Sequence, residues 1–431
     1  MPVDALQNIV FIDGCRTPFL RSSTQFGDFT SYDLARLALK GLVGKTGIDK
    51  SIVDRLILGT VISNLQTSNV AREALLGSGL CEQTPAFTVT QACISANAAI
   101  SAGVDLITVG QAKTVIAGGT ESMSDIPIRY RKKIRKKLVA SQRYRKPTDW
   151  LGFLKGLKLV DLLPEIPSIT EFSTNRTMGQ DCDRMAARIG ISREDQDAFA
   201  ARSHKLAAQA TKDGILADEI VAVNVPPKFK RVEEDNGIRG DSTPEKLAKL
   251  KPAFIKPYGT ITAGNASFLT DGASAVLLMD ENHAKANGHQ PKAWIRHYTF
   301  TARGPQEELL LGPAYAISDI LYKSGLTLDD IDVFELHEAF AGQVLANLDC
   351  MASDTFAKEN LNKDKAVGRI PMEKLNVHGG SLSLGHPFGA TGARLVTTAA
   401  NRLIRENGRY ALIAACAAGA LGHAMILERY S

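Results

Sequence analysis

One pattern occurs twice in the sequence, as GIDKSIVDRLILGTVI at residues 47–62 and as GLTLDDIDVFELHEAF at residues 325–340. The copies are separated by a constant offset of 278 positions. They share a glycine, an aliphatic residue and an aspartate, so that Gly47, Ile48 and Asp54 match Gly325, Leu326 and Asp332. Each copy predicts that a helix ends, that the chain turns at the glycine, and that a buried strand follows. The chain is therefore predicted to contain two related halves.

A second pattern follows each copy along the chain. In the first half, the strand-like FTVTQAC at residues 87–93 leads into a small-residue helical stretch and then into TVIAGG at residues 114–119. In the second half, the loop GGSLSLGHPFGATG at residues 379–392 leads into a helical stretch and then into ALIAAC at residues 411–416. Alternation of strand, loop, helix and strand favours an α/β fold with βαβ crossovers in both halves.

The region between the halves does not follow this pattern. It contains amphipathic helical runs such as SREDQDAFAARSHKLAAQATKDG, where Ser192 precedes Asp195 at the spacing of a capping box. An insertion that leaves and rejoins the first half explains the interruption. We therefore predict three units, which are residues 1–125 with 265–285 as the first half, residues 126–264 as an inserted, largely helical loop domain, and residues 286–431 as the second half.

The composition is that of a globular protein. Its 431 residues, 44% hydrophobic and 23% charged, suit two or three domains with their own cores. No apolar run approaches the ~18–20 residues of a membrane span. The start of the chain lacks a basic segment before its short apolar stretch, which favours a first strand over a secretory signal. The six cysteines are spread singly, which disfavours a disulfide framework or a metal cluster and predicts a reducing, cytoplasmic location.

The positive charge is concentrated in one segment. The whole chain carries 51 basic and 46 acidic residues, a net charge of +5. Residues 128–158 hold twelve basic residues and one acidic residue, so this segment carries +11 and the remainder −6. Such an asymmetry predicts an anionic partner.

Two cysteines follow predicted strands. Cys93 precedes a helix rich in Ala and Ser, where the positive end of the helix dipole lowers the pKa of a thiol and raises its thiolate fraction. A small cysteine packed between a strand and a helix would give the same pattern. Cys416 ends the strand ALIAAC, and taken alone it is more typical of a core cysteine.

Two histidines lie where a site would form. His386 is in the glycine-rich loop at residues 379–392, where glycines let the backbone approach a ligand closely. His337 and Glu338 end the buried strand IDVFEL, and strand ends of open α/β sheets form sites. The alternative for Glu338 is a helix-capping carboxylate. If the two halves converge, a thiol beside an imidazole predicts acyl transfer, and the second cysteine suggests another proton carrier for a carbanion.

Five motifs together carry a resemblance to the thiolase family along essentially the whole chain. They are C-I-S at Cys93–Ser95, TAGNASFLTDGA at 262–273, H-E-A-F at His337–Phe340, G-H-P at Gly385–Pro387 and C-A-A-G at Cys416–Gly419. His337 stands where most thiolases have Asn, which resembles the β subunits of fatty-acid-oxidation trifunctional complexes and their bacterial relatives. Two positions depart from the family pattern, because Ala420 replaces a common glycine and His378 stands where relatives vary.

The resemblance implies a fold and an activity. The fold is two pseudo-symmetric βαβ-type halves in α/β/α/β/α layers with the inserted loop domain. The activity is thiolytic cleavage of medium- or long-chain 3-ketoacyl-CoA in fatty acid β-oxidation, with coenzyme A as a substrate and with no metal or redox cofactor. The implied roles are Cys93 as nucleophile, His386 as its base, Cys416 as second proton carrier, His337 and His386 as enolate donors, the Cys93 and Ala418 N–H groups as donors to the acyl oxygen, Glu338 as an orienting group, and Ser267 as a contact of the pantetheine arm.

The resemblance also implies partners, and other functions compete with it. The expected partners are a second copy, as a homodimer or dimer of dimers, and a hydratase/dehydrogenase α subunit in an α2β2-type complex. The competing functions are a non-catalytic membrane or assembly subunit, a ketoacyl synthase, and an acetyl-CoA C-acetyltransferase working by condensation. The retained Cys93, His386 and Cys416 disfavour the first of these, and Cys416 also disfavours the synthase.

Residues 128–163 combine the basic segment with an apolar set after Pro147. Leu151, Leu154 and Phe153 with Leu157 fall at helical spacing, which predicts an amphipathic helix in a bilayer interface. The predicted membrane-binding residues are Trp150, Phe153, Leu154, Lys132, Lys133 and Lys136. This hypothesis places the protein at the inner membrane face. Docking of the α subunit, attraction of CoA phosphates and a solvated loop are the alternatives, and no nucleic-acid-binding fold accompanies the charge.

Overall fold

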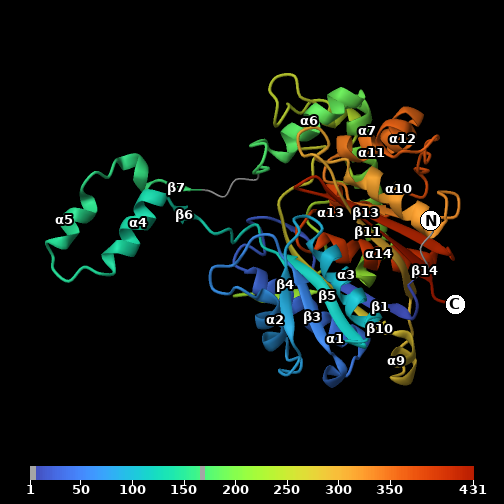
Figure 1. The fold of residues 1–431 in the computed structure, drawn as a ribbon, viewed down its shortest axis with the longest axis horizontal. Coiled ribbons are helices and arrows are strands. Elements are labelled where there is room, and N and C mark those ends of the chain that lie inside the picture. Colours follow the sequence, from blue (N-terminus) through green and yellow to red (C-terminus); the bar gives the residue numbers. More distant parts are fainter. Residues whose placement is uncertain (1–5, 166–169) are drawn as a thin grey trace.

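The structure, a computed structural model, describes residues 6–165 and 170–431. Residues 1–5 and 166–169 of the predicted units lie outside the described residues. Both halves form one body of helices around a large sheet, and residues 128–165 project from this body as a separate segment, here called the arm (Figure 1).

The predicted alternation of strands and helices is present in both halves. The strands are β1 (Ile9–Arg16), β2 (Leu20–Arg21), β3 (Arg55–Gly59), β4 (Ala86–Val89), β5 (Thr114–Glu121), β6 (Arg129–Tyr130), β7 (Pro164–Glu165), β8 (Val223–Val225), β9 (Lys230–Val232), β10 (Thr270–Asp280), β11 (Ala293–Ala302), β12 (Val333–Leu336), β13 (Tyr410–Ala417) and β14 (Leu421–Arg429). The helices are α1 (Ser31–Thr46), α2 (Val70–Ser78), α3 (Ser95–Thr108), α4 (Lys132–Ser141), α5 (Asp149–Leu154), α6 (Met178–Ile189), α7 (Arg193–Lys212), α8 (Pro244–Leu247), α9 (Glu281–Ala286), α10 (Gly312–Ser324), α11 (Ala341–Met351), α12 (Asp354–Asn360), α13 (Ser381–Leu384) and α14 (Thr391–Arg405).

The main sheet has ten strands in the order β12-β13-β14-β11-β1-β10-β5-β3-β4, with β2 paired to β10. The two halves meet where Val10 and Phe11 of β1 pair with Trp294 and Ala293 of β11. Strand β10 lies between β1 and β5, so the chain returns to the sheet of the first half after the insertion.

The repeated sequence pattern marks equivalent elements in the two halves. Helix α1 ends at Gly47 with φ 62°, and α10 ends at Gly325 with φ 71°. Strand β3 then pairs in parallel with β5, as β12 does with β13. The prediction of a helix end, a glycine turn and a buried strand is therefore confirmed for both copies.

Helices cover the sheet in the expected α/β/α/β/α layers. Helices α3 and α14 contact each other, and α14 contacts strands of both halves. Helices α1 and α2 pack against the first half, and α10 packs against β11, β13 and β14 of the second (Figure 1). The close approach of α3 and α14 requires a glycine, because a Cβ at Gly392 would lie 2.1 Å from Oδ1 of Asn97.

The insertion contains two long helices that pack on the body. Helices α6 and α7 both contact α11, and α7 also contacts α13, which lies within the glycine-rich loop at residues 379–392. The predicted start of α7 is confirmed, since the Ser192 hydroxyl accepts the N–H of Asp195 at 3.0 Å.

The arm differs from its prediction. The expected apolar helix through Leu157 is wrong, because α5 ends at Leu154 and Gly156 adopts a left-handed φ of 75° that interrupts the helix. Three predicted membrane-binding residues are engaged within the arm, where Phe153 packs on Trp150 and Lys133 pairs with Asp161 at 2.8 Å. Across residues 6–165 and 170–431, every helix is too short or too polar to cross a membrane.

Candidate active site

Cys93 lies in the turn between β4 and α3. The Ser95 hydroxyl closes this turn, because it accepts the N–H of Gln91 at 2.8 Å and donates to the carbonyl of Ala92 at 2.6 Å. Ala92 adopts φ 47°, a left-handed conformation that is unfavourable for a residue with a Cβ. A strained turn closed by hydrogen bonds therefore presents the thiol.

The thiol of Cys93 is a poor thiolate in the resting site. Its surface remains partly exposed, yet protein surrounds the sulfur, and this burial raises the pKa of Cys93 to about 12. The charge of Glu121 raises the pKa further, whereas the N–H groups of Ala418 and Cys93 donate to the sulfur and lower it. The predicted lowering by the helix dipole is wrong in net direction, because burial dominates and α3 begins only at Ser95. Cys93 therefore needs a base to become a nucleophile.

Cys416 comes to the same site from the other half. It is buried near the end of β13, and burial raises the pKa of its thiol above the usual range. A charge on Cys93 raises the pKa of Cys416 further, which means that the two sulfurs are near neighbours. The structure thus brings together the two predicted cysteines, which are 323 positions apart in the sequence.

The two predicted histidines lie against each other. The ring centroids of His337 and His386 are 4.0 Å apart, and both side chains are buried. Burial, together with the charge of Arg394, lowers the pKa of His386 to about 3. Burial is the main reason that the pKa of His337 lies well below its usual range. The charges of His386 and Arg394 lower it further. Both rings are therefore neutral near pH 7.

The neighbours of His386 define its tautomer. The Thr391 hydroxyl donates to the carbonyl of Pro387 at 3.1 Å, so its oxygen accepts from Nδ1 of His386 at 2.6 Å. With its proton on Nδ1, the neutral ring has a lone pair on Nε2. His386 is thus arranged as a base.

The neighbours of His337 favour the opposite tautomer. Ser381 Oγ accepts from Arg394 Nη2 at 3.3 Å, and its hydroxyl hydrogen can be donated to Nδ1 of His337 at 3.0 Å. We therefore assign the proton of His337 to Nε2, which makes it a donor. In the described part of the chain, Nε2 of both His337 and His386 is buried without a hydrogen-bond partner. Buried polar atoms are almost always paired, so a base and a donor are left free for a ligand.

Glu338 is fixed by three bonds in the wall of the site. Its carboxylate accepts from Ser203 Oγ at 2.7 Å, from Asn376 Nδ2 at 2.7 Å and from the N–H of Leu382 at 3.3 Å. These partners belong to α7 and to the segment around the glycine-rich loop. The helix-cap alternative applies in part, because Leu382 lies in the first turn of α13, but the same carboxylate also bonds Ser203 of α7 and Asn376. The sequence analysis did not identify Asn376 as part of this site.

The loop after β13 contains the departure at Ala420. Gly419 has φ 81° and Ala420 has φ 56°, so a buried alanine occupies a conformation that favours glycine. The loop is held on both sides of this position. The N–H of Gly419 donates to Glu171 Oε2 at 2.7 Å, and the Ala420 carbonyl accepts from Arg303 at 3.0 Å.

Ser267 lies beside the loop of His386, because its N–H donates to the carbonyl of Ala339 at 2.9 Å and Leu269 forms a bridge with His386.

A basic patch that the sequence analysis missed lies next to Ser267. The Arg21 guanidinium stacks 4.0 Å over the ring of Phe268, and burial together with nearby Arg239 lowers the pKa of Arg21. Neither guanidinium forms an ion pair with any described carboxylate. Such a pair can accept an anion.

A buried charge cluster underlies the histidines. Glu335 of β12 pairs with Arg402 at 2.9 Å and with Arg394 at 3.4 Å, and all three side chains are buried. Arg394 is the residue that bonds Ser381 and lowers the pKa of both histidines. A charged residue inside the apolar strand VFEL and arginines in a buried helix were the sequence signals for this cluster.

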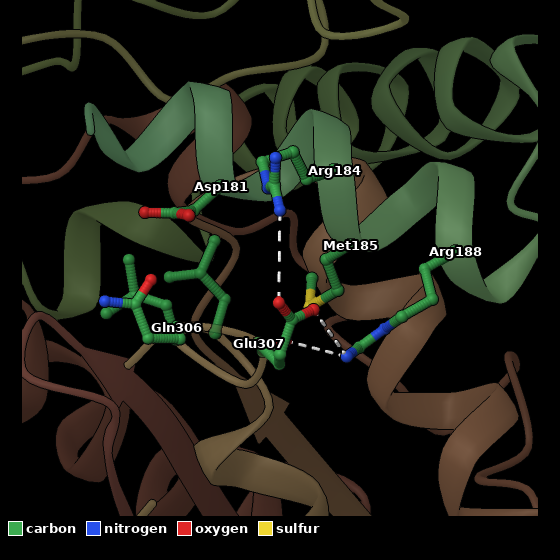
Figure 2. A pocket seen from close by; sticks show the side chains of 8 residues that line it. Asp181, Arg184, Met185, Arg188, Gln306 and Glu307 are labelled. Atoms are coloured by element: carbon green, nitrogen blue, oxygen red, sulfur yellow. Dashed lines mark hydrogen bonds and ion pairs between the residues drawn. The ribbon is translucent and has the colours of Figure 1, made fainter. Parts of the chain in front are cut away.

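A small pocket elsewhere in the described part of the chain lacks the chemistry of this site. Figure 2 shows a small pocket between α6 and the loop before α10, where Glu307 pairs with Arg188 at 3.2 Å and with Arg184 at 3.9 Å. None of the predicted catalytic residues lines this pocket. Among residues 6–165 and 170–431, no three His, Cys, Asp or Glu side chains gather as a metal ion would require.

Comparison with known families agrees with this geometry. Residues 9–282 match the thiolase N-terminal domain, and residues 289–429 match the thiolase C-terminal domain. The chain therefore belongs to the thiolase family, whose members are acyltransferases.

Individual relatives narrow the likeness. The chain is 54% identical over 425 residues to the mitochondrial trifunctional enzyme subunit beta of Bos taurus, covering 99% of this chain and 89% of the relative. It is 44% identical to a 3-ketoacyl-CoA thiolase of Yersinia pestis, covering 97% and 96%. Its fold matches human mitochondrial 3-ketoacyl-CoA thiolase in complex with CoA, with a TM-score of 0.85, 31% identity and full coverage of both chains.

Proposed function

We propose that this protein is a 3-ketoacyl-CoA thiolase of fatty acid β-oxidation, which transfers the acyl group of a 3-ketoacyl-CoA to a second CoA. The observation that carries the proposal is a pair of neighbouring thiols, one from each half, together with two neutral imidazoles that lie against each other and whose Nε2 atoms are free and differ in protonation. Glu121 links the two pairs, because its charge acts on Cys93 and its carboxylate accepts the N–H of Gly389 in the His386 loop. This arrangement supplies a nucleophile, a base, an oxyanion donor and a second proton carrier in one site.

The first half-reaction uses His386 and Cys93. His386 Nε2 takes the thiol proton, and the sulfur attacks the 3-keto carbon. The bond between C2 and C3 then breaks, which leaves the acyl group on Cys93 and expels the enolate of acetyl-CoA. His337 Nε2–H and the newly protonated His386 Nε2 donate to the enolate oxygen. Cys416 gives its proton to the enolate carbon and releases acetyl-CoA.

The second half-reaction restores every proton. The Cys416 thiolate takes the proton of the incoming CoA thiol, and the CoA sulfur attacks the thioester on Cys93. The N–H groups of Cys93 and Ala418, which donate to the sulfur in the resting site, would donate to the developing oxyanion instead. Collapse releases the shortened acyl-CoA, and His386 returns its proton to Cys93.

We infer that CoA enters past Ser267 and that the pair of Arg21 and Arg239 receives one of its phosphates. The support is the position of Ser267 beside the His386 loop and the nearness of Arg21 to Arg239, neither of which forms a close ion pair with a described carboxylate, although the charge of Arg239 lowers the pKa of Asp241. CoA acts here as a substrate, and the proposed chemistry needs neither a metal nor a redox cofactor.

The names of the relatives support a proposal about assembly. Relatives called trifunctional enzyme subunit beta belong to a multisubunit enzyme by name, so we propose that this chain also binds an α subunit, as a homodimer or dimer of dimers.

For the arm we propose contact with an anionic membrane surface. The support is the exposure of Leu151 (70%), Leu154 (66%) and Leu159 (86%) beside the basic helix α4. We propose a cytoplasmic location for the protein as a whole.

The activity is tested by product analysis across 3-ketoacyl-CoA chain lengths. The purified chain, with and without any co-purifying protein, is incubated with 3-ketoacyl-CoA substrates of short to long chain and with CoA. We expect acetyl-CoA and the acyl-CoA shortened by two carbons in equal amounts. Absence of both products at every chain length would contradict the proposed function.

A further inference from the structure

Glu121 is a buried carboxylate that the mechanism above does not use. It ends β5, is fully buried, and receives hydrogen bonds from two different segments. From the turn after β3, the N–H groups of Val61 and Ile62 donate to it at 3.0 Å each, and the Thr60 hydroxyl donates at 3.3 Å. From the loop of His386, the N–H of Gly389 donates at 2.9 Å.

The loop of His386 passes tightly against the first half at this point. A Cβ at Gly389 would lie 2.5 Å from the carbonyl of Thr120 and 2.7 Å from that of Gly59, so only glycine allows this approach. Gly389 lies three positions after His386 and two positions before Thr391, the residue that fixes the His386 tautomer. Movement of Gly389 would therefore move both His386 and its hydrogen-bond partner.

We propose that ionised Glu121 is a positioning residue, which fastens the His386 loop of the second half to the turn after β3 of the first half. The inference rests on the proposed function, because it concerns the placement of the base that activates Cys93.

The distribution of donors explains why a carboxylate is required. Oε2 accepts from Val61 and Gly389, and Oε1 accepts from Ile62 and Thr60. Three of these four donors are backbone N–H groups, which cannot reverse their direction. A protonated carboxyl or an amide turns at least one oxygen position into a donor, and an N–H group facing it loses its acceptor. The fewest hydrogen bonds are lost if Oε1 is the position that becomes a donor, because the Thr60 hydroxyl can turn and accept from it. The N–H of Ile62 is then left without an acceptor.

The charge state of Glu121 changes within the physiological range. Burial raises its pKa to about 7, although the bonds from Ile62, Val61, Gly389 and Thr60 oppose this rise. The other titratable groups near it do not titrate there, since the pKa of Cys93 is raised to about 12 and that of His386 lowered to about 3. On the neighbouring strand, burial raises the pKa of Asp271, which bonds Ser124. Loop attachment should therefore weaken as the pH falls through about 7.

The test is the pH profile of kcat, measured for thiolysis with saturating substrates between pH 6 and 8.5 in the wild type, Glu121→Gln and Asp54→Asn. Asp54 is the matched control, because its carboxylate also accepts two backbone N–H groups, those of Lys113 and Thr114. These lie at the start of β5, whereas Glu121 lies at its end, next to the site. In the wild type we expect kcat at pH 6 to be about tenfold below its value at pH 8.

Glu121→Gln should lower kcat at pH 8 by ~10–100-fold with KM for CoA changed less than ~3-fold, and should flatten the acid limb. Asp54→Asn should keep the wild-type profile. The inference is overturned if Glu121→Gln keeps both the wild-type kcat and its acid limb. It is equally overturned if the active wild type has no acid limb near pH 7, a result that stands even where the variant fails to fold. Wild-type inactivity would instead contradict the proposed function.

Discussion

The protons on His337 and His386 are set by single hydroxyl groups. Thr391 keeps Nε2 of His386 free of a proton, and Ser381 directs the proton of His337 to its own Nε2. The asparagine found at the His337 position in most thiolases offers an amide N–H in a similar role. Asparagine can therefore replace His337 only in the role of a hydrogen-bond donor.

This assignment predicts that His337→Asn keeps part of the activity. An oxyanion donor is worth ~10²–10³-fold in kcat, and an amide that reaches the same oxygen only through a water should recover a portion of it. We expect a loss of ~10-fold for His337→Asn and ~100-fold for His337→Ala, measured as kcat for thiolysis. Equal losses in both variants, with the fold intact by circular dichroism, would contradict the donor role.

Cys416 and Cys93 should separate in their effects. In Cys416→Ala, we expect Cys93 still to be acylated by a donor thioester, because that step does not need the second thiol. Carbon–carbon cleavage should fall by ~10²–10⁴-fold, since a proton carrier is lost. Mass spectrometry of the acyl-enzyme and the thiolysis rate measure the two steps. A loss of less than tenfold in cleavage would make Cys416 a core residue only.

The sequence indicated the candidate reacting side chains but not the residues that support them. Cys93, His337, His386 and Cys416 stand out because each lies at a strand end or in a glycine-rich loop. Ser381 and Glu121 look ordinary in the sequence, because their roles depend on partners 44 and 268 positions away. Thr391 is only five positions from His386, but its role depends on how the loop folds back on itself. The pKa of Cys93 could not be read from its helix either, because it is set mainly by burial in the folded protein, which raises it and outweighs the N–H of Ala418 from the other half.

At the scale of elements, the repeated glycine turns and buried strands were predictable because they depend on local chain preferences. The arm was less predictable. Its apolar residues have helical spacing, yet α5 ends at Leu154, before the left-handed Gly156. The side chains of Trp150 and Phe153 pack on each other within the arm. What remains outward-facing is Trp150, Val160 and a set of leucines next to a basic helix.

The arm should bind anionic vesicles through these leucines. We expect flotation of the wild type with vesicles of anionic lipid and none with neutral lipid, because each basic residue near such a surface contributes ~1 kcal/mol. The double substitution Leu151→Ser with Leu154→Ser should abolish flotation. Leu65→Ser, which changes an exposed leucine (77%) of the body, is the matched control and should float like the wild type. Thiolysis of a short-chain substrate should stay within ~3-fold in all variants. Equal binding to both lipids, or binding unaffected by the arm substitutions, contradicts the membrane proposal and favours docking of an α subunit.

At the scale of the whole molecule, the site depends on both halves at once. The first half provides Cys93 and Glu121, and the second provides His337, His386 and Cys416. The structure places Cys93 near Cys416, and Glu121 against the His386 loop. It does so although β4 and β5 run opposite to β12 and β13, since β1 and β11 pair antiparallel. The internal repeat thus predicts two related halves, whereas their convergence at one site required the structure.

The most direct test is a single turnover without CoA. The protein is mixed with a 3-ketoacyl-CoA, quenched and digested, and the free acetyl-CoA and the acylated peptide are both identified by mass spectrometry. We predict one acetyl-CoA released per acyl group bound, with that acyl group on Cys93 and none bound in Cys93→Ala. Acyl attachment to another residue, or release of acetyl-CoA without any acyl-enzyme, would contradict the account.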